Sequence, residues 1–209
     1  MEIKSENLRK YLIYNVNLKN ENIINESDLL KLESIHISYF NNSLKEAIFY
    51  PEEIAYFENL REIYFSGFTI TDDIIININK LTKLNTLIFN NCKIISNIRV
   101  NNNIKTLYME LSDSELLSII NKKTNVNKIY LEDVNNVDIK KLNEYENLEE
   151  LTLLNSNLQN CFYLVYFRKL KKLKVIGCKL DNLEVIERMK YNQSNKIEIT
   201  YSTKKYYKL

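Results

Sequence analysis

The chain repeats one pattern of apolar and polar positions along most of its length. Over residues 148–180 each apolar position recurs after 22 residues: Leu148, Leu151, Leu153 and Leu158 return as Leu170, Leu173, Val175 and Leu180. If the first leucine is position 1, apolar residues stand at positions 4 and 6, and polar residues stand at positions 2, 3 and 5. This alternation is typical of a half-buried strand, so it predicts that positions 4 and 6 point inward and positions 3 and 5 face solvent.

The same template fits the rest of the chain. Its turns start at Leu8, Leu32, Leu60, Leu84, Ile104, Val126, Leu148, Leu170 and Ser194. At positions 1, 4 and 6 the nine turns carry 26 apolar residues out of 27, whereas at positions 2, 3 and 5 they carry 5 out of 27. The registers were chosen on the first count alone, so the low second count shows that the alternation is real. We expect one strand per turn, including an irregular first strand at Tyr11–Tyr14.

The segments between the strands carry signals for short helices. Ser112–Glu115 and Asp181–Glu184 resemble capping boxes, in which the first side chain and a glutamate three residues later satisfy free backbone N–H groups. Pro51 suits the first position of a helix. By contrast, residues 94–103 are too short and too rich in asparagine for more than a turn.

A pattern LxxLxLxx(N/C)xL with a period of about 20 to 29 residues marks a leucine-rich repeat. The chain most resembles the 22-residue repeats of bacterial internalins, because Leu164 and Phe167 also fall where that subclass places apolar residues. The resemblance implies an α/β fold: a horseshoe-shaped solenoid with a parallel sheet on the concave face and short helices and turns on the convex face. It also implies a protein-binding function.

The asparagine that the family places at position 9 is missing here. That position holds Val16, Phe40, Phe68, Cys92, Ser112, Val134, Ser156 and Cys178. Apolar side chains cannot satisfy backbone groups in the turns, so the turns should differ from those of the family.

These patterns predict a single leucine-rich repeat domain over residues 1–209. Residues 1–31 form an N-terminal cap with a first irregular turn, and residues 32–193 form the regular repeats. Residues 194–209 form a capping strand and a charged tail. The tail, Lys204–Lys208, blocks the open sheet edge or, alternatively, offers a basic patch to a partner.

Composition narrows the class of partner. Lys and Arg number 29 and Asp and Glu 27, a net charge of +2 that argues against nucleic-acid binding. No apolar run is long enough for a signal peptide or a membrane span, which predicts a cytoplasmic protein without a membrane partner. The three cysteines, Cys92, Cys161 and Cys178, lack metal-ligand spacing and are expected to be free core thiols.

The residues needed for catalysis are sparse. His36 is the one histidine, and it falls at an outward position 5. Gly67 and Gly177, the two glycines, stand at position 8, where a strand turns, and not in a phosphate-binding loop. We therefore expect no enzyme activity, no cofactor, no metal and no small-molecule substrate.

The candidate site is a stripe of apolar residues at outward positions. All five stand at position 5: Leu12, Tyr64, Ile88, Tyr108 and Tyr130. His36 extends the stripe, Glu110 and Glu132 flank it, and Lys174 belongs to a basic patch beyond it. An aromatic centre with a charged rim is typical of protein-binding hot spots. The alternative is that these residues are good strand formers whose stacking stabilises the sheet.

These observations favour a monomeric, non-catalytic module that binds another protein through its concave face. Such a module acts as an adaptor or as a stoichiometric inhibitor, for example an antagonist of a toxin or nuclease in microbial conflict. Two alternatives remain open. One is nucleic-acid binding through Lys171–Lys174 and the tail, and the other is that the chain is a fragment of a larger exported adhesin or enzyme.

Overall fold

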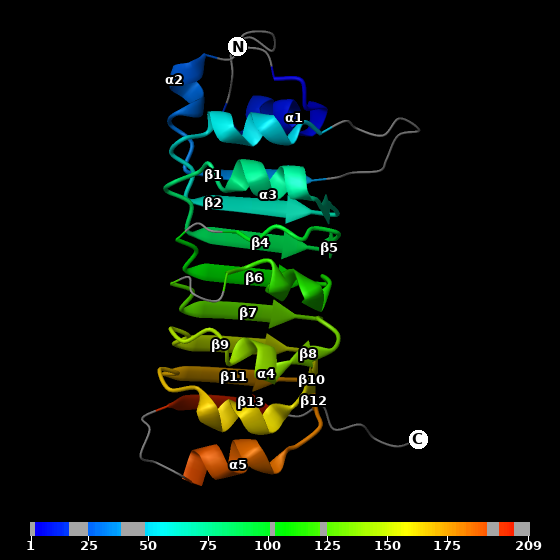
Figure 1. Cartoon of the computed structure of the whole chain (residues 1–209), viewed down its shortest axis with the longest axis vertical. Helices are drawn as coiled ribbons and strands as arrows, with labels where there is room; N and C mark the ends of the chain where they lie inside the picture. Colours follow the sequence, from blue (N-terminus) through cyan, green and yellow to red (C-terminus); the bar gives the residue numbers. More distant parts are fainter. Residues whose placement is uncertain are drawn as a thin grey trace.

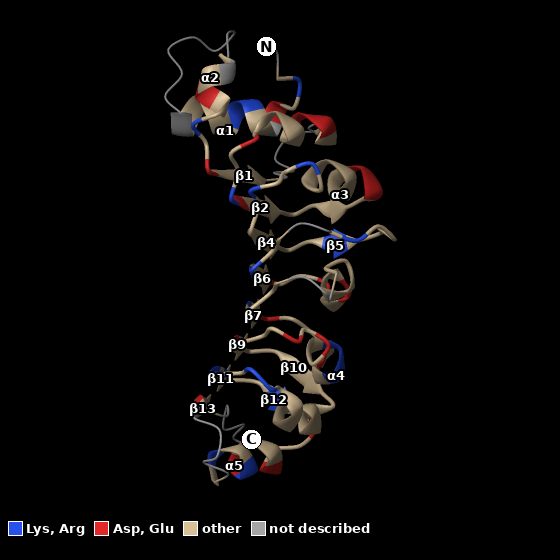
Figure 2. Cartoon of the chain, turned by 60° about the vertical axis from the view of Figure 1, so that its left-hand side comes forward, with Lys and Arg blue, Asp and Glu red and all other residues tan. Residues whose placement is uncertain are grey.

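The computed structural model describes residues 3–16, 25–38, 49–100, 103–121, 125–191 and 197–202. Within them the main sheet has eight parallel strands in the order β1-β2-β4-β6-β7-β9-β11-β13 (Figure 1). The strands are β1 Ser34–Ser38, β2 Glu62–Ser66, β4 Thr86–Asn90, β6 Thr106–Glu110, β7 Lys128–Glu132, β9 Glu150–Leu154, β11 Lys172–Ile176 and β13 Glu198–Ser202. The expected α/β leucine-rich repeat solenoid is confirmed. Seen from the side, the stack bends gently towards the sheet, which makes the sheet the concave face (Figure 2).

The return segments form the opposite, convex face (Figure 2). They are η1 Pro51–Tyr56, α3 Asp72–Ile78, η2 Ser114–Ser118, α4 Ile139–Leu142, η3 Cys161–Tyr166 and α5 Glu184–Tyr191, where η marks a 3-10 helix. Short strands pair beside them: β3 Thr69–Ile70 with β5 Lys93–Ile94, and β10 Asn157–Gln159 with both β8 Val137–Asp138 and β12 Lys179–Leu180. Pro51 does stand at the start of η1, and no helix follows β5 before β6 in the described residues.

The core lies between the two faces and follows the template. From β1 to β11 each strand pairs with its neighbour position for position, as in Leu107 with Ile129 and Ile129 with Leu151. Leu107 and Leu151 are almost completely buried, as are the other residues at positions 4 and 6 of these strands. Burial of this continuous apolar column is the main free-energy gain on folding.

The first turn is not a strand. Residues Glu6–Val16 form α1, which packs against β1, so the expected strand at Tyr11–Tyr14 is wrong. Leu8 and Leu12 stand four residues apart on one helical face and are both completely buried, so Leu12 does not belong to the outward stripe. The buried Glu53 carboxylate of η1 accepts hydrogen bonds from the backbone N–H groups of Lys4 and Ser5 and thereby fixes the start of α1.

The last strand pairs two residues later than expected. Leu173 faces Ile199 and Val175 faces Tyr201, which moves the start of this turn from Ser194 to residue 196. Apolar Ile197, Ile199 and Tyr201 alternate with polar residues, so both registers place the same side chains inward. The observed register goes with a longer return segment, which contains α5. The charged tail, Lys204–Lys208, lies outside the described residues.

Neither expected capping box forms. Asp113, not Ser112, caps η2 by accepting a hydrogen bond from the Glu115 N–H at 3.0 Å. Asp181 accepts hydrogen bonds from the N–H groups of Asn160 and Cys161 in the preceding turn, and α5 begins only at Glu184. In both places the side chain that was expected to cap a helix, Ser112 or Asp181, forms a hydrogen bond with another turn instead.

Serine and cysteine replace the missing asparagine at position 9. Ser112 Oγ accepts a hydrogen bond from the Cys92 N–H at 3.0 Å and lies 3.2 Å from the carbonyl oxygen of Phe89. Ser156 accepts a hydrogen bond from the Val134 N–H at 3.1 Å. Cys92 Sγ lies 3.4 Å from the carbonyl oxygen of Phe65, and burial raises the pKa of this thiol to about 11, which keeps it a donor. These turns therefore satisfy their backbone groups without asparagine.

Position 8 takes a left-handed backbone conformation in every turn from β2 to β11. The residues there are Gly67, Asn91, Leu111, Asp133, Asn155 and Gly177. The conformation lets each N–H reach the next strand; that of Leu111 donates to the Glu132 carbonyl at 3.0 Å. Glycine, asparagine and aspartate tolerate this conformation, but a residue such as leucine pays about 1–2 kcal/mol for it. Leu111 is also 57% exposed, so it gains little burial in return.

We predict that Leu111→Gly stabilises the protein. The relief of backbone strain exceeds the extra flexibility of glycine in the unfolded chain, which leaves a gain of about 0.5–1 kcal/mol and a rise of roughly 1–4 °C in melting temperature. Thermal and urea unfolding of the variant measure this gain. Asn91→Gly serves as the control, because asparagine already tolerates φ of 49° there. A Leu111→Gly protein no more stable than this control would contradict the strain at Leu111.

Candidate functional site

The sheet register places the residues of the predicted stripe in one line across the concave face. His36 pairs with Tyr64, Tyr64 with Ile88, Ile88 with Tyr108, and Tyr108 with Tyr130. Thr152 and Lys174 continue the line on β9 and β11. Five of the stripe residues that the sequence singled out thus stand on five consecutive strands, and each side chain keeps some exposure to solvent.

The aromatic side chains of the stripe form two contacts. The His36 and Tyr64 rings meet edge to face with centroids 3.8 Å apart. The Tyr108 and Tyr130 rings stack almost in parallel, with centroids 4.3 Å apart and an angle of 9° between their planes. Partial burial lowers the pKa of His36, so its ring is neutral near pH 7. The end of the stripe at His36 and Tyr64 therefore presents aromatic rings without a positive charge.

The residues at position 7, which are polar from β1 to β7, form a row beside the stripe. Tyr130 donates a hydrogen bond to Glu132 Oε2 at 2.8 Å, and the Tyr108 hydroxyl lies 3.3 Å from the same oxygen. On the next strand Asn90 donates to Glu110 Oε2 at 2.7 Å. Glu110 and Glu132 are register partners, and neither forms an ion pair with another described residue. We call Tyr108, Tyr130, Glu110 and Glu132 the Tyr–Glu cluster. This cluster combines aromatic surface with negative charge.

The Tyr–Glu cluster changes the acidity of its own hydroxyl groups. Burial raises the pKa of Tyr108 and Tyr130, and the neighbouring glutamates raise it further because a tyrosinate would repel them. Both hydroxyls therefore stay protonated as donors through the physiological pH range.

The lysines beyond the stripe do not form an isolated basic patch. Lys171 pairs with Glu149 at 2.9 Å. Lys172 stands in register between Glu150 and Glu198, where charges of opposite sign alternate. Lys174 lies in the stripe row, between Thr152 and Thr200. This interleaving reduces the positive field that phosphate binding would require, so the geometry gives no support to a nucleic-acid surface here.

Potential metal ligands and thiols are dispersed or buried in the part of the chain that the structure describes. Among those residues no three His, Cys, Asp or Glu side chains group together as a metal site would require. Cys92, Cys161 and Cys178 are buried and free, and burial raises the pKa of Cys161 to about 12. None of the helices described is long and apolar enough to cross a membrane.

Two features, one on each face of the solenoid, were missed by the sequence analysis. The first is Asn90 at position 7, which orients Glu110. Comparing the residues at position 7 of successive turns, as was done for position 5, would have found Asn90. On the convex face Phe162, Val165 and Tyr166 are exposed. The sequence of this return segment, CFYLVY, indicates their exposure, because it has more apolar residues than one inward face can bury.

The raised tyrosine pKa values predict a loss of stability at high pH. Tyrosines in the unfolded chain ionise near pH 10, whereas Tyr108 and Tyr130 in the folded chain hold their protons to higher pH. The contribution of these two tyrosines to the free energy of unfolding is therefore fully present below about pH 10 and is lost as the pH rises through the folded-state pKa values. Glu132→Gln removes a charge that raises both values, so this variant should lose less stability between about pH 9 and 11.

Urea unfolding at several pH values measures the effect, with Glu58→Gln, an exposed glutamate on the loop after η1, as the control. Equal pH dependence in Glu132→Gln and in the wild type would show that Glu132 does not act on the two hydroxyls.

Comparisons with known proteins address the fold. No protein-family model and no curated protein matches the sequence. Among solved structures, internalin C2 from Listeria monocytogenes aligns over 87% of this chain and 78% of its own, with 21% identity and a TM-score of 0.54. An internalin-like protein of the same species aligns over 84% of this chain and 62% of its own, with 16% identity and a TM-score of 0.43. The chain thus has a leucine-rich repeat fold that resembles the fold of internalin C2.

Proposed function

We propose that the chain is a non-catalytic module that binds another protein on its concave face, with the Tyr–Glu cluster at the centre of the contact. The observation that carries the proposal is the stacked pair Tyr108 and Tyr130, held by Glu132 beside the Glu110 carboxylate that Asn90 orients. Tyrosine offers a large contact area with one polar tip, which is why it is enriched at binding hot spots.

The position of the pair on a rigid sheet supports this role. Tyr108 and Tyr130 stand on adjacent central strands whose backbones are hydrogen-bonded on both sides. Stacking and the hydrogen bond to Glu132 already restrict the two rings, so less conformational entropy is lost when a partner covers them. The cost of ordering these side chains is met during folding and not during binding.

The alternative is that the tyrosines stabilise the sheet and nothing more. Positions 3, 5 and 7 lie on the same strands and face the same solvent, so strand propensity alone should place aromatic residues in all three rows. Yet position 3 holds Ser34, Glu62, Thr86, Thr106, Lys128, Glu150, Lys172 and Glu198, and position 7 holds Ser38, Ser66, Asn90, Glu110, Glu132, Leu154, Ile176 and Ser202. The restriction of aromatic residues to position 5 favours selection for a binding surface.

A module without catalytic groups acts through binding alone, by covering a surface of its partner. The role proposed here is that of a monomeric stoichiometric inhibitor, such as an antagonist of a toxin or nuclease, or of an adaptor. Three buried free thiols suit a reducing compartment and support a cytoplasmic location. His36, Tyr64 and Ile88 extend the contact on one side of the cluster, and Lys174 marks its rim on the other.

We predict that Tyr108→Ala and Tyr130→Ala each weaken the complex by roughly 30-fold or more, since loss of a hot-spot side chain costs at least about 2 kcal/mol of binding. Stability should fall by no more than about 1 kcal/mol, the range for one cross-strand pair. Affinity pull-down with mass spectrometry identifies the partner, and calorimetry with the purified partner measures the affinity.

Tyr56→Ala is the matched control, because Tyr56 is an exposed tyrosine on the convex side and its loss should leave the affinity unchanged. If stability fell in the Tyr108 and Tyr130 variants while the affinity of the folded fraction stayed constant, the stripe would be a structural ladder.

A further inference from the structure

The convex face carries an apolar surface at η3 that the concave-face function does not use. Phe162, Val165 and Tyr166 are 45%, 47% and 56% exposed. In the neighbouring return segments the exposed positions are polar: Glu115 and Ser118 on η2, and Lys140 and Lys141 on α4. η3 thus gathers three exposed large apolar side chains, whereas η1, α3 and α5 each expose one: Tyr56, Ile76 and Tyr191. Exposed apolar groups gathered in this way mark interaction sites.

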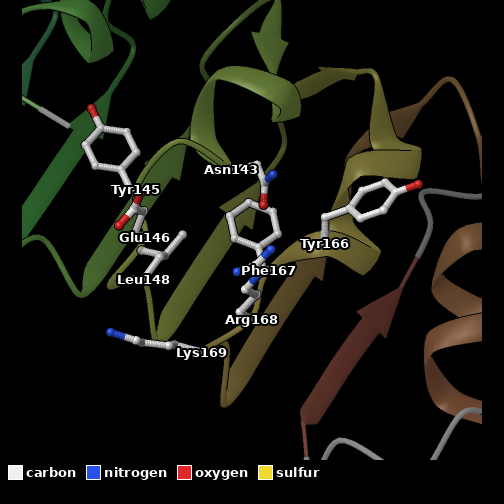
Figure 3. A pocket seen from close by; sticks show the side chains of 8 residues that line it. All are labelled: Asn143, Tyr145, Glu146, Leu148, Tyr166, Phe167, Arg168 and Lys169. Carbon is white, nitrogen blue, oxygen red and sulfur yellow. The ribbon is translucent and has the colours of Figure 1, made fainter. Parts of the chain in front are cut away.

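Two hollows flank this surface, and Tyr166 lines both. The first, of about 380 Å³, also has Phe167, Leu148, Asn143 and Arg168 in its walls. Figure 3 shows Tyr166 at one end of this hollow and Tyr145 at the other. Its volume falls in the range of sites that hold small ligands or several side chains.

The second hollow, of about 230 Å³, lies between η3 and α5 and has Phe162, Val165, Val185 and Arg188 in its walls. It has room for little more than one side chain. The surface therefore consists of a larger hollow, the Tyr166 ring and a smaller apolar hollow.

Each hollow contains one arginine that is available to a partner. Arg168 forms no ion pair with a described residue. Arg188 lies 3.3 Å from Glu184, but both side chains are about three-quarters exposed, and such surface pairs contribute little and exchange readily. The guanidinium group matches a carboxylate with two parallel hydrogen bonds, so it selects acidic groups.

We propose that this convex surface docks an extended acidic peptide segment of a partner protein. An apolar side chain of the segment packs on Phe162 and Val165, the chain crosses Tyr166, and carboxylates on either side meet Arg168 and Arg188. The site is separate from the Tyr–Glu cluster, which lies on the opposite face.

A membrane surface fits these features less well than a peptide does. A bilayer contacts a protruding surface with a uniformly basic rim, whereas these apolar groups border two hollows. Glu146 lines the first hollow beside Arg168 and Lys169, and Glu184 and Glu187 lie on α5 beside the second, so the rim is not uniformly basic as an anionic bilayer requires. Single carboxylates of a peptide can instead contact Arg168 and Arg188 one at a time.

The test uses a phage-displayed library of random dodecapeptides selected on the full chain, with counter-selection on Tyr166→Ala. Counter-selection removes peptides that bind elsewhere, including the concave face. Enriched peptides should carry Asp or Glu on both sides of a large apolar residue. Fluorescence anisotropy with the synthetic peptides should show affinity reduced about tenfold or more by Tyr166→Ala and by Arg168→Gln. Both residues lie at the surface, and thermal unfolding verifies that the variants fold.

Tyr56→Ala and Tyr108→Ala are the controls, and both should bind the peptides as the wild type does. Loss of binding in Tyr108→Ala would place the peptides on the concave face and overturn the proposal. So would the absence of enriched peptides, enrichment of basic peptides, or affinity that Arg168→Gln leaves unchanged. Co-sedimentation with phosphatidylserine vesicles, in the absence of any selected acidic peptide, would assign the surface to a membrane instead. Failure here leaves the concave-face proposal untouched, because the two tests use different variants.

Discussion

The hydrogen bonds between successive turns hold the whole structure together in one register. At the corner after each strand, the left-handed residue at position 8 donates its N–H to the next strand, and several side chains at position 9 bond to neighbouring turns. Buried backbone groups must find partners, so a turn can stack only where these bonds form. Every strand from β1 to β11 therefore starts at the same template position, and side chains of one position line up across the sheet.

This register turns a local sequence pattern into a surface. Single tyrosines in separate turns become a stacked pair because β6 and β7 are aligned, and the same alignment brings Glu132 to both hydroxyls. It also explains the strain at Leu111, where the corner requires a left-handed residue whatever the side chain.

The sequence predicted what depends on period and could not predict what depends on contacts between turns. Positions 4 and 6 are buried and the stripe is aligned because these follow from alternation within strands. The errors arose where another physical factor decided. Leu8 and Leu12 fit a helix as well as a strand, and β13 could shift by two residues without exposing its apolar side. Asp181 bonded to the preceding turn in place of its own helix, and the hollows beside Tyr166 depend on packing between returns.

Site-specific photo-crosslinking is the most direct measurement of where a partner sits. A photoreactive phenylalanine analogue would replace Tyr108 in one sample and Ser118, an exposed residue of η2 on the convex face, in another. Illumination in extracts of the cells that make the protein, followed by mass spectrometry, identifies what lies within a few ångströms of each position. Concave-face binding predicts one discrete partner cross-linked from position 108 and none from position 118. A partner captured from position 118 and not from position 108 would contradict it.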